Sequence, residues 1–417
     1  MRGPSNIVFQ KDIGVRKGPT WITDNTEVEK GLSELYRLVT ASGGWLHPDL
    51  RIVNTGAALY VESGLPAEDS SRIMGIPASL MAPVDAFDLA IVDDELRANG
   101  VREALGSDTV AAMECLLAIY NGARKVPAFR RQHPLLSLAP WPELIEYLLA
   151  GRAGNPKVEA LGSLFREGRW EELLKLTFLG SRVVRFQFHG SWPGERRESL
   201  MPFMDFLNHH LQGSPYKKGI FPNGPSGLHA QNAKPIPGSE ETFAIYFRLD
   251  PLDSYLVYGF RDQCPPLTRS ISLELNLGDT LRFEVMGRIT GTFERKLPTS
   301  LQDLRMYMPK VHFVDKNSVK ISHLFIPGSD APRSLFRVLA SLIKTARPDL
   351  HQETINSWAR QGEAQVIEKN LHYYQKLQTL AEGASTDSED PAPLEEVKTL
   401  ARTQLDRLQS HAKRRDF

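Results

Sequence analysis

The order of strand-like and helix-like segments constrains the fold of this chain more than any other feature. Helical spacing of apolar residues predominates from Asp94 to Phe178, whereas strand character returns at Arg182–Phe188 and continues through Tyr258. Before the helices, short apolar runs bounded by Gly and Pro predict strands at Arg51–Asn54, Ala57–Val61 and Arg72–Ile76. A β-rich part that resumes after a block of helices indicates one sheet interrupted by a helical insertion, and therefore an α+β fold.

The rest of the chain is richer in helices. Two further strands are predicted at Ser270–Leu277 and Thr280–Gly287, and long helices at Ala331–Ala346 and His351–Ala381. Residues Glu382–Pro393 are small, acidic and proline-bearing, which is typical of a linker. The other clear helical patterns are Val28–Ser42, Thr109–Tyr120, Trp141–Leu149, Pro156–Leu176 and the basic Leu394–Arg414.

A chain of 417 residues is expected to form two or three packed units. We predict an N-terminal extension and helix at 1–40 and a β-rich domain at 41–265, with the helical insertion at 94–178. A largely α-helical C-terminal domain follows at 266–381. An acidic linker and a terminal basic helix complete the chain at 382–417.

Composition excludes several classes of protein. Lys plus Arg and Asp plus Glu both number 50, so the formal charge is zero, and neither nucleic acid nor an anionic membrane is the expected partner. The chain has two cysteines, Cys115 and Cys264, which are far apart and support neither a disulfide framework nor a zinc site. No apolar leader and no run of about 18 apolar residues is present, which predicts a cytoplasmic protein without a membrane span.

Two motifs carry the chemistry. The first is Pro202-x-x-Asp205-x-x-Asn208-His209, which we interpret as a strand end running into a polar Asn-His turn. The second lies in two apolar segments interpreted as strands, Thr242–Phe247 and Tyr255–Phe260. It consists of Tyr246 followed, twelve positions later, by Tyr258-Gly259-Phe260.

Together these motifs resemble those of SET-domain methyltransferases, in the branch of the Rubisco large-subunit methyltransferase and the actin histidine methyltransferase. The resemblance implies a β-rich SET fold with a pseudoknot and an S-adenosylmethionine-dependent protein-lysine N-methyltransferase. It also extends to the turn Gly56-Ala57-Ala58-Leu59, to Ser181-Arg182, and to Arg360 and Glu368-Lys369 in the C-terminal part. In the related enzymes this C-terminal domain holds a protein partner, so a protein substrate is expected.

Site residues follow from the resemblance. It implies catalytic roles for Tyr258 and Tyr246 and no metal. The residues that it implies for cofactor binding are Gly56, Ala58, Leu59, Arg182, Asp205, Asn208, His209, Tyr258 and Phe260. Methyl transfer from a sulfonium to an amine is an in-line displacement that needs a neutral amine and a site that excludes water, and a tyrosine hydroxyl can orient the nucleophile there.

Departures from the family pattern leave alternatives open. Ala58 and Phe247 stand where the family has glycine, and Asp250-Pro251 replaces a Ser-Asn pair. These changes support a noncatalytic SET-like interaction protein that has lost the cofactor. Histidine or a small molecule is the alternative acceptor on the same scaffold.

Simpler structural roles are also open. Tyr258 alone would be a core tyrosine, Asn208-His209 a turn, and Gly56 a turn glycine. Asp93, Asp94 and Glu95 are interpreted as charges at a helix start rather than a metal site. Aromatic residues at Phe186, Phe188 and Trp192 could line a substrate channel, although alternating aromatics in a strand are usually core.

Overall fold

The structure is a computed structural model, and it divides into two compact units. The first unit comprises Met1–Leu89, Arg97–Lys125 and Val183–Tyr246, and the second comprises Ala90–Leu96, Val126–Arg182 and Phe247–Phe417. Each unit is therefore assembled from segments far apart in the sequence. The structure describes residues 18–66, 69, 71–188, 196–221, 224–233, 236, 238–246, 250–261, 267–278, 280–286, 299–305, 307–328, 333–384 and 390–415. Trp192, Phe247, Cys264 and part of the predicted linker lie outside these residues.

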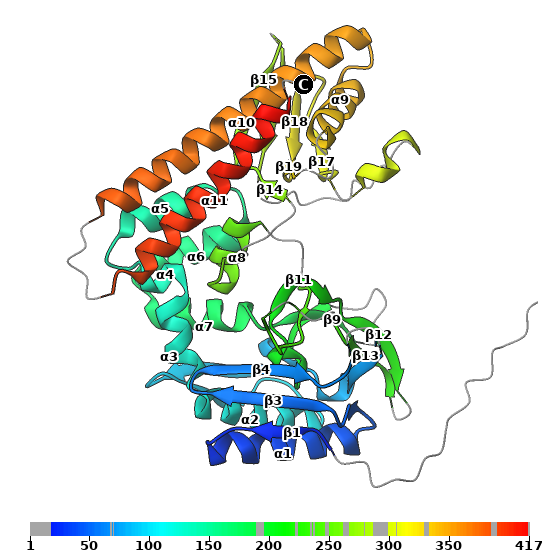
Figure 1. Ribbon diagram of the computed structural model, residues 1–417, viewed down its shortest axis with the longest axis vertical. Coiled ribbons are helices and arrows are strands. Elements are labelled where there is room, and N and C mark those ends of the chain that lie inside the picture. Colours follow the sequence, from blue (N-terminus) through cyan, green and yellow to red (C-terminus); the bar gives the residue numbers. More distant parts are fainter. Residues whose placement is uncertain are drawn as a thin grey trace, which may run out of the picture. The chain divides into compact units, whose positions relative to one another are not determined.

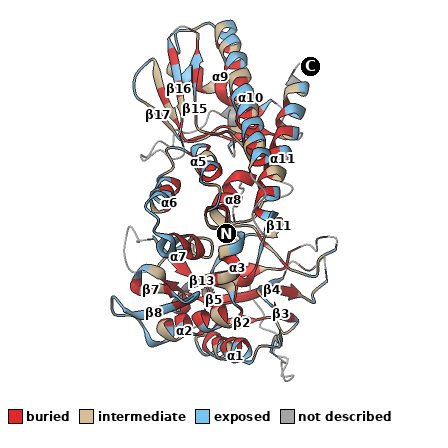
Figure 2. Cartoon of the chain, turned by 90° about the vertical axis from the view of Figure 1, so that its left-hand side faces the viewer, coloured by how far each residue is buried: buried red, intermediate tan, exposed pale blue. Residues whose placement is uncertain are grey.

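Two helices, α1 (Thr26–Ala41) and α2 (Ser107–Gly122), pack against each other in the first unit (Figure 1). The Asn25 side chain begins α1 by accepting hydrogen bonds from the backbone N–H groups of Glu27 and Val28 at 3.0 and 3.1 Å. Its amide also donates to the Gly122 carbonyl at 2.9 Å, which ties the two helices together. One face of α1 is buried, as its apolar spacing predicts (Figure 2).

Strands from both sides of the helical insertion pair in the first unit. Strand β5 (Arg72–Pro77) pairs with β13 (Gly224–Gln231), and β6 (Ala82–Pro83) pairs with β10 (Arg196–Leu200), both antiparallel. The interrupted β-rich part is thus confirmed, although it forms several small sheets rather than one. Their strand orders are β1-β3-β4, β6-β10-β9 and β12-β13-β5-β2. The remaining strands are β1 (Thr20–Ile22), β2 (Trp45–Leu46), β3 (Leu50–Thr55), β4 (Ala58–Ser63), β9 (Val184–Gln187), β11 (His209–Ser214) and β12 (Lys217–Phe221), with short 3-10 turns η1 (Ala78–Leu80) and η2 (Val84–Ala86).

The acidic run at Asp93-Asp94-Glu95 does not begin a helix. Strands β7 (Phe87–Val92) and β8 (Glu95–Val101) form a hairpin, and Asp93 and Asp94 make its two-residue turn with φ of 53° and 61°. Positive φ at both turn positions matches the twist of a hairpin, and Asp tolerates it better than most residues. The prediction of a helix start here was therefore wrong.

The helical insertion contributes its later helices to the second unit. They are α3 (Lys125–Gln132), α4 (Pro134–Ser137), α5 (Pro142–Ala150), α6 (Pro156–Arg166) and α7 (Trp170–Gly180). The single helix predicted over Pro156–Leu176 is divided, because Gly168 has a φ of 68° that ends α6 before α7 begins.

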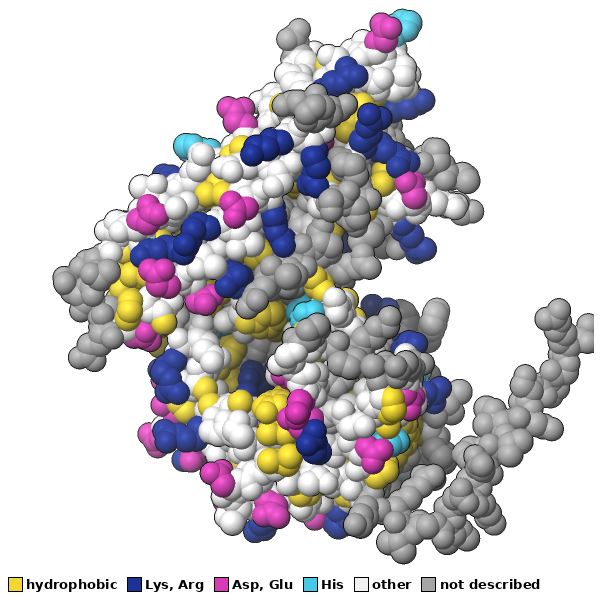
Figure 3. All heavy atoms as spheres, in the orientation of Figure 1, with side chains coloured by type: hydrophobic (Ala, Val, Ile, Leu, Met, Phe, Trp, Pro, Cys, Tyr) yellow, Lys and Arg dark blue, Asp and Glu magenta, His cyan; other side chains and the backbone are white. Residues whose placement is uncertain are grey.

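The C-terminal part combines a sheet with long helices, so the predicted α+β class is confirmed. Strands run in the order β15-β16-β18-β17, and β14 pairs with β19. Helix α10 (Gln352–Gly383) packs against α9 (Ser334–Ala346) and α11 (Ala392–Arg415). Lys and Arg side chains are distributed along α11 (Figure 3), in agreement with the predicted basic helix. The strands are β14 (Leu267–Arg269), β15 (Leu273–Leu277), β16 (Leu281–Val285), β17 (Val311–Phe313), β18 (Ser318–Ile321) and β19 (Phe325–Pro327), with a 3-10 turn η4 (Thr299–Leu304).

One apolar core joins the two parts of the second unit. It includes Leu144 and Leu148 of α5 together with Tyr374 and Leu377 of α10, all buried. Within the described part of the chain, every helix is too short or too polar to cross a lipid bilayer. Among the described residues, no three His, Cys, Asp or Glu side chains are grouped as metal ligands.

Candidate functional site

The predicted Gly56 turn is a tight hairpin between β3 and β4. Gly56 has a φ of 57°, and the Asn54 side-chain amide donates to the carbonyls of Gly56 and Ala58 at 2.9 Å each. A Cβ added to Gly56 would meet nothing within 4 Å, so the glycine is needed for its backbone conformation rather than for a close contact. Ala58 is exposed and Leu59 is buried.

The Asp205–His209 segment differs from the predicted strand end and turn. Met204–Phe206 forms a 3-10 turn, η3, and β11 begins at His209, so the strand follows the Asn-His pair instead of preceding it. The Asp205 carboxylate accepts a short hydrogen bond from the Tyr120 hydroxyl of α2. Because η3 also contacts β4, this segment lies against the strand that carries Leu59.

Tyr246 holds the Asn-His segment directly. Its hydroxyl donates to the Leu207 carbonyl at 2.6 Å, and its backbone N–H donates to His209 Nδ1 at 3.1 Å. The Ala244 N–H donates to the Asn208 carbonyl at 2.9 Å. In its described part, residues 242–246, the predicted strand Thr242–Phe247 is replaced by isolated bridges of Ala244 to β11, and the preceding Glu241 bridges to Glu62 of β4.

A polar cluster lies beside these segments, and we define it as Asn208, Glu241, Lys125 and the Ala57 carbonyl. The Asn208 amide donates to Glu241 Oε1 at 2.5 Å, and Lys125 Nζ donates to the Ala57 carbonyl at 3.1 Å. Burial raises the pKa of Glu241 to about 6, against the opposing effects of the Asn208 hydrogen bond and the Lys125 charge. Neither Glu241 nor Lys125 belongs to a recognisable motif, so no sequence signal identified them.

Tyr258 lies on a helix rather than on the predicted strand Tyr255–Phe260. Helix α8 (Pro251–Tyr258) begins where the Asp250 carboxylate accepts a hydrogen bond from the Asp253 N–H at 2.8 Å, with Pro251 as the first helical residue. Gly259 ends it with a φ of 76°. The Asp250-Pro251 pair, noted in the sequence as a departure from the family pattern, is therefore a helix start.

A buried ionic network anchors the start of α8. The Arg152 guanidinium is 1% exposed and donates to Asp250 at 2.7 Å and to Asp253 at 2.6 Å. Asp250 also accepts hydrogen bonds from the Arg269 backbone N–H and the Gln404 amide, each at 3.2 Å. Burial alone would raise the pKa of Asp253, but the positive charges of Arg152 and Arg269 lower it to about 2. No sequence pattern indicates this network, because its members are far apart in the chain.

Tyr258 and Phe260 stand close together at the end of α8, with ring centroids 5.7 Å apart. Burial raises the pKa of Tyr258 above its ordinary value. Gly259, between them, lies against His133, since a Cβ on the glycine would be 3.1 Å from His133 Cα. His133 is fully buried, and burial lowers its pKa to about 3.

Arg182 follows α7 and stacks on aromatic rings. Its guanidinium carbon lies 3.9 Å from the centroid of the Phe178 ring and 5.4 Å from that of Phe129. It also donates to the Phe178 carbonyl at 3.1 Å and to Ser181 Oγ at 2.8 Å. These contacts give Arg182 a structural role within the second unit.

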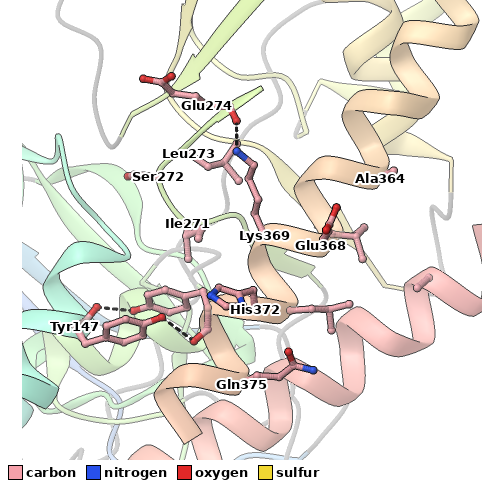
Figure 4. A pocket seen from close by; sticks show the side chains of 14 residues that line it. Tyr147, Ile271, Ser272, Leu273, Glu274, Ala364, Glu368, Lys369, His372 and Gln375 are labelled. Carbon is pink, nitrogen blue, oxygen red and sulfur yellow. Dashed lines mark hydrogen bonds between the residues drawn. The ribbon is translucent and has the colours of Figure 1, made fainter. Parts of the chain in front are cut away.

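The second unit also contains an open groove of about 930 Å³, shown in Figure 4. Tyr147 and Tyr373 line it, and their ring centroids are 4.8 Å apart in a stacked arrangement. The Tyr147 hydroxyl donates to the Tyr373 carbonyl at 3.3 Å, and the Tyr373 hydroxyl donates to the Tyr147 carbonyl at 2.9 Å. Lys369, one of the residues noted in the sequence, donates to the Glu274 carbonyl at 2.9 Å and so ties α10 to β15. Its neighbour Glu368 is exposed on the groove.

The structure distributes the predicted site residues over the two units. Asp205, Asn208, His209 and Tyr246 come together in the first unit with the Gly56–Leu59 hairpin. Arg182, Tyr258 and Phe260 belong to the second unit.

Comparison with solved structures finds similarity to SET-domain proteins. It is similar to the SET domain of LSMT bound to lysine and AdoHcy, with 13% identity and a TM-score of 0.38, over 92% of this chain and 90% of the other. It is also similar to Rubisco LSMT bound to sinefungin and monomethyllysine, with 12% identity and a TM-score of 0.40, over 91% and 90% of the two chains. No family model matches the sequence, and no curated protein does either.

Proposed function

We propose that this protein is an S-adenosylmethionine-dependent methyltransferase of the SET type. The observation that carries the proposal is the direct bonding of Tyr246 to both Leu207 and His209, beside the Gly56 hairpin. These are the segments to which the sequence resemblance assigns the cofactor and part of the chemistry. Of the second motif, Tyr246 takes part in this arrangement, whereas Tyr258 and Phe260 belong to the second unit.

The residues present fit such a cofactor. Asn208 is exposed beside the Glu241 carboxylate and belongs to the polar cluster with Lys125, which suits a ligand carrying an amino-acid group. Ala58 is exposed, so its methyl group is not packed in the protein interior. In the first unit, we assign cofactor binding to Gly56, Ala58, Leu59, Asp205, Asn208 and His209. The cofactor-binding roles that the resemblance implies for Arg182, Tyr258 and Phe260 of the second unit stay predictions. When bound, the cofactor supplies a methyl group on a positively charged sulfur. The chain's own residues supply orientation and an environment that excludes water.

Two tyrosines have different proposed roles. The Tyr246 hydroxyl is bonded to the Leu207 carbonyl, so we assign it to holding the Asn-His segment in position. The Tyr258 hydroxyl would orient the lone pair of the accepting amine. A lysine acceptor must be neutral, and a half-buried site favours this by disfavouring the ammonium form.

Protein lysine is the proposed acceptor, and the groove lined by Glu368, Lys369 and His372 is the proposed docking surface. The test is transfer of a radiolabelled methyl group from S-adenosylmethionine into a cell extract. We expect label in the protein fraction with the wild-type enzyme and almost none with Asn208→Ala. Gln212→Ala, at an exposed position on β11, is the matched control and should retain transfer.

Other outcomes separate the alternatives. Label confined to the low-molecular-mass fraction would replace the protein acceptor with a small molecule. Label on histidine after hydrolysis of the protein fraction would replace lysine with histidine. No label in either fraction, together with no cofactor binding, would favour a noncatalytic interaction protein.

A further inference from the structure

We infer that Glu241 and Lys125 recognise the charged amino-acid end of the cofactor, with Glu241 receiving the α-ammonium group and Lys125 the α-carboxylate. This inference rests on the proposed function. It adds two residues that the sequence motifs do not contain.

The position of Glu241 carries the inference. Its half-buried carboxylate accepts the Asn208 amide at 2.5 Å, and the backbone at Glu241 bridges to Glu62 of β4. Among the residues that the structure describes, no Lys, Arg or His nitrogen lies within 4.0 Å of this carboxylate. A carboxylate withdrawn from water without a cation at hand is suited to a positively charged ligand.

The neighbouring cations Arg51 and Lys125 are bonded to other groups. Arg51 is committed to Glu62 at 3.0 Å and to Glu240 at 3.3 Å. The negative charge of Glu62 acts in the same direction as burial and raises the pKa of Glu241. Lys125 lowers that pKa, but its ammonium group bonds the Ala57 carbonyl of the hairpin.

The arrangement matches a zwitterion. An α-amino acid presents an ammonium group and a carboxylate on one carbon, and the polar cluster offers a carboxylate and an ammonium group on adjacent segments. Charge-assisted hydrogen bonds of this kind are the stronger class, and partial burial reduces their screening by salt. A lysine ammonium group binds a carboxylate as a compact point charge. Lys125 carries this charge to the hairpin, where its Nζ donates to the Ala57 carbonyl.

Calorimetry with two ligands tests the inference. S-adenosylhomocysteine carries the amino-acid end, whereas methylthioadenosine lacks it. We expect Glu241→Gln and Lys125→Met each to weaken S-adenosylhomocysteine binding by roughly 10- to 100-fold, with methylthioadenosine affinity within about twofold of wild type. Glu240→Gln and Lys30→Gln, at exposed neighbouring and remote sites, are the matched controls and should change neither affinity.

Each outcome has a distinct meaning. If wild type binds neither ligand, the proposed function fails. If wild type binds S-adenosylhomocysteine and Glu241→Gln binds it equally well, the inference is wrong and the proposed function stands. If a variant binds neither ligand, the same test can be made without a mutation, by titrating the wild-type protein with the deaminated analogue of S-adenosylhomocysteine. Affinity equal to that of the parent compound would then overturn the role of Glu241.

Discussion

At the scale of single residues, the Tyr258 hydroxyl is the group on which the proposed chemistry depends most. We expect Tyr258→Phe to lower the rate of methyl transfer at least about tenfold, while the affinity for S-adenosylhomocysteine stays nearly unchanged, because the hydroxyl acts mainly in the transition state. Single-turnover transfer and calorimetry measure the two quantities. Tyr36→Phe on α1 is the control. Equal turnover in the Tyr258 variant and wild type would remove the assigned role.

A second residue, His133, makes the stability of the fold depend on pH because its imidazole is buried. Its folded-state pKa of about 3 lies below the ordinary value of 6.5, so the unfolded chain binds the extra proton as pH falls. The contribution of neutral, buried His133 to the free energy of unfolding is therefore fully present above about pH 6.5. It is lost progressively as the pH falls toward 3, by about 3 kcal/mol at pH 4. His133→Leu should show a smaller loss of unfolding free energy between pH 7 and pH 4 in denaturant titrations. An unchanged loss would mean that other groups control the acid sensitivity.

At the scale of elements, helix α8 depends on its buried start. Asp250→Ala would leave the Arg152 guanidinium buried without one of its two carboxylates, and we expect a loss of about 3–5 kcal/mol of unfolding free energy. The comparison is Glu146→Ala, which breaks the exposed pair with Arg166 and should cost less than about 1 kcal/mol. Chemical denaturation measures both. Similar losses of unfolding free energy in the two variants would show that the buried network adds little stability.

The ends of the same helix are marked in the sequence, whereas its buried partners are not. The start signal Asp250-Pro251 and the stop signal Gly259 are present in the sequence, and weighing them above the apolar run would have predicted α8. The helices α1, α5 and α10 were predictable because their apolar spacing is long and regular. Arg152, Arg269 and Gln404 could not be foreseen as partners of Asp250, since only the tertiary fold brings these distant positions together.

At the scale of the whole molecule, the second unit joins the insertion helices to the C-terminal part through one core. The four-part division drawn from the sequence stays a prediction. We expect deletion of residues 266–417 to unfold what remains of the second unit, because it removes Arg269, Gln404 and the α10 side of the core. Limited proteolysis should then cut within 126–182, whereas the intact chain resists there. Equal resistance would show that the insertion folds without the C-terminal part.

The candidate site was predictable to a similar degree. Asn208, His209 and Tyr246 were found from motif spacing, and the fold places them in contact. Glu241 and Lys125 were missed because a single glutamate or lysine has no pattern to distinguish it from a solvated charge. Their relation to the hairpin exists only once β3, β4 and the 241–246 segment are assembled.

The central claim, that this chain binds S-adenosylmethionine, is tested most directly by calorimetric titration of the full-length protein with S-adenosylmethionine and S-adenosylhomocysteine. We predict saturable heat with both ligands and a rise in thermal unfolding temperature, since a ligand that binds only the folded state stabilises it. The absence of both heat and thermal shift at millimolar ligand would contradict the account.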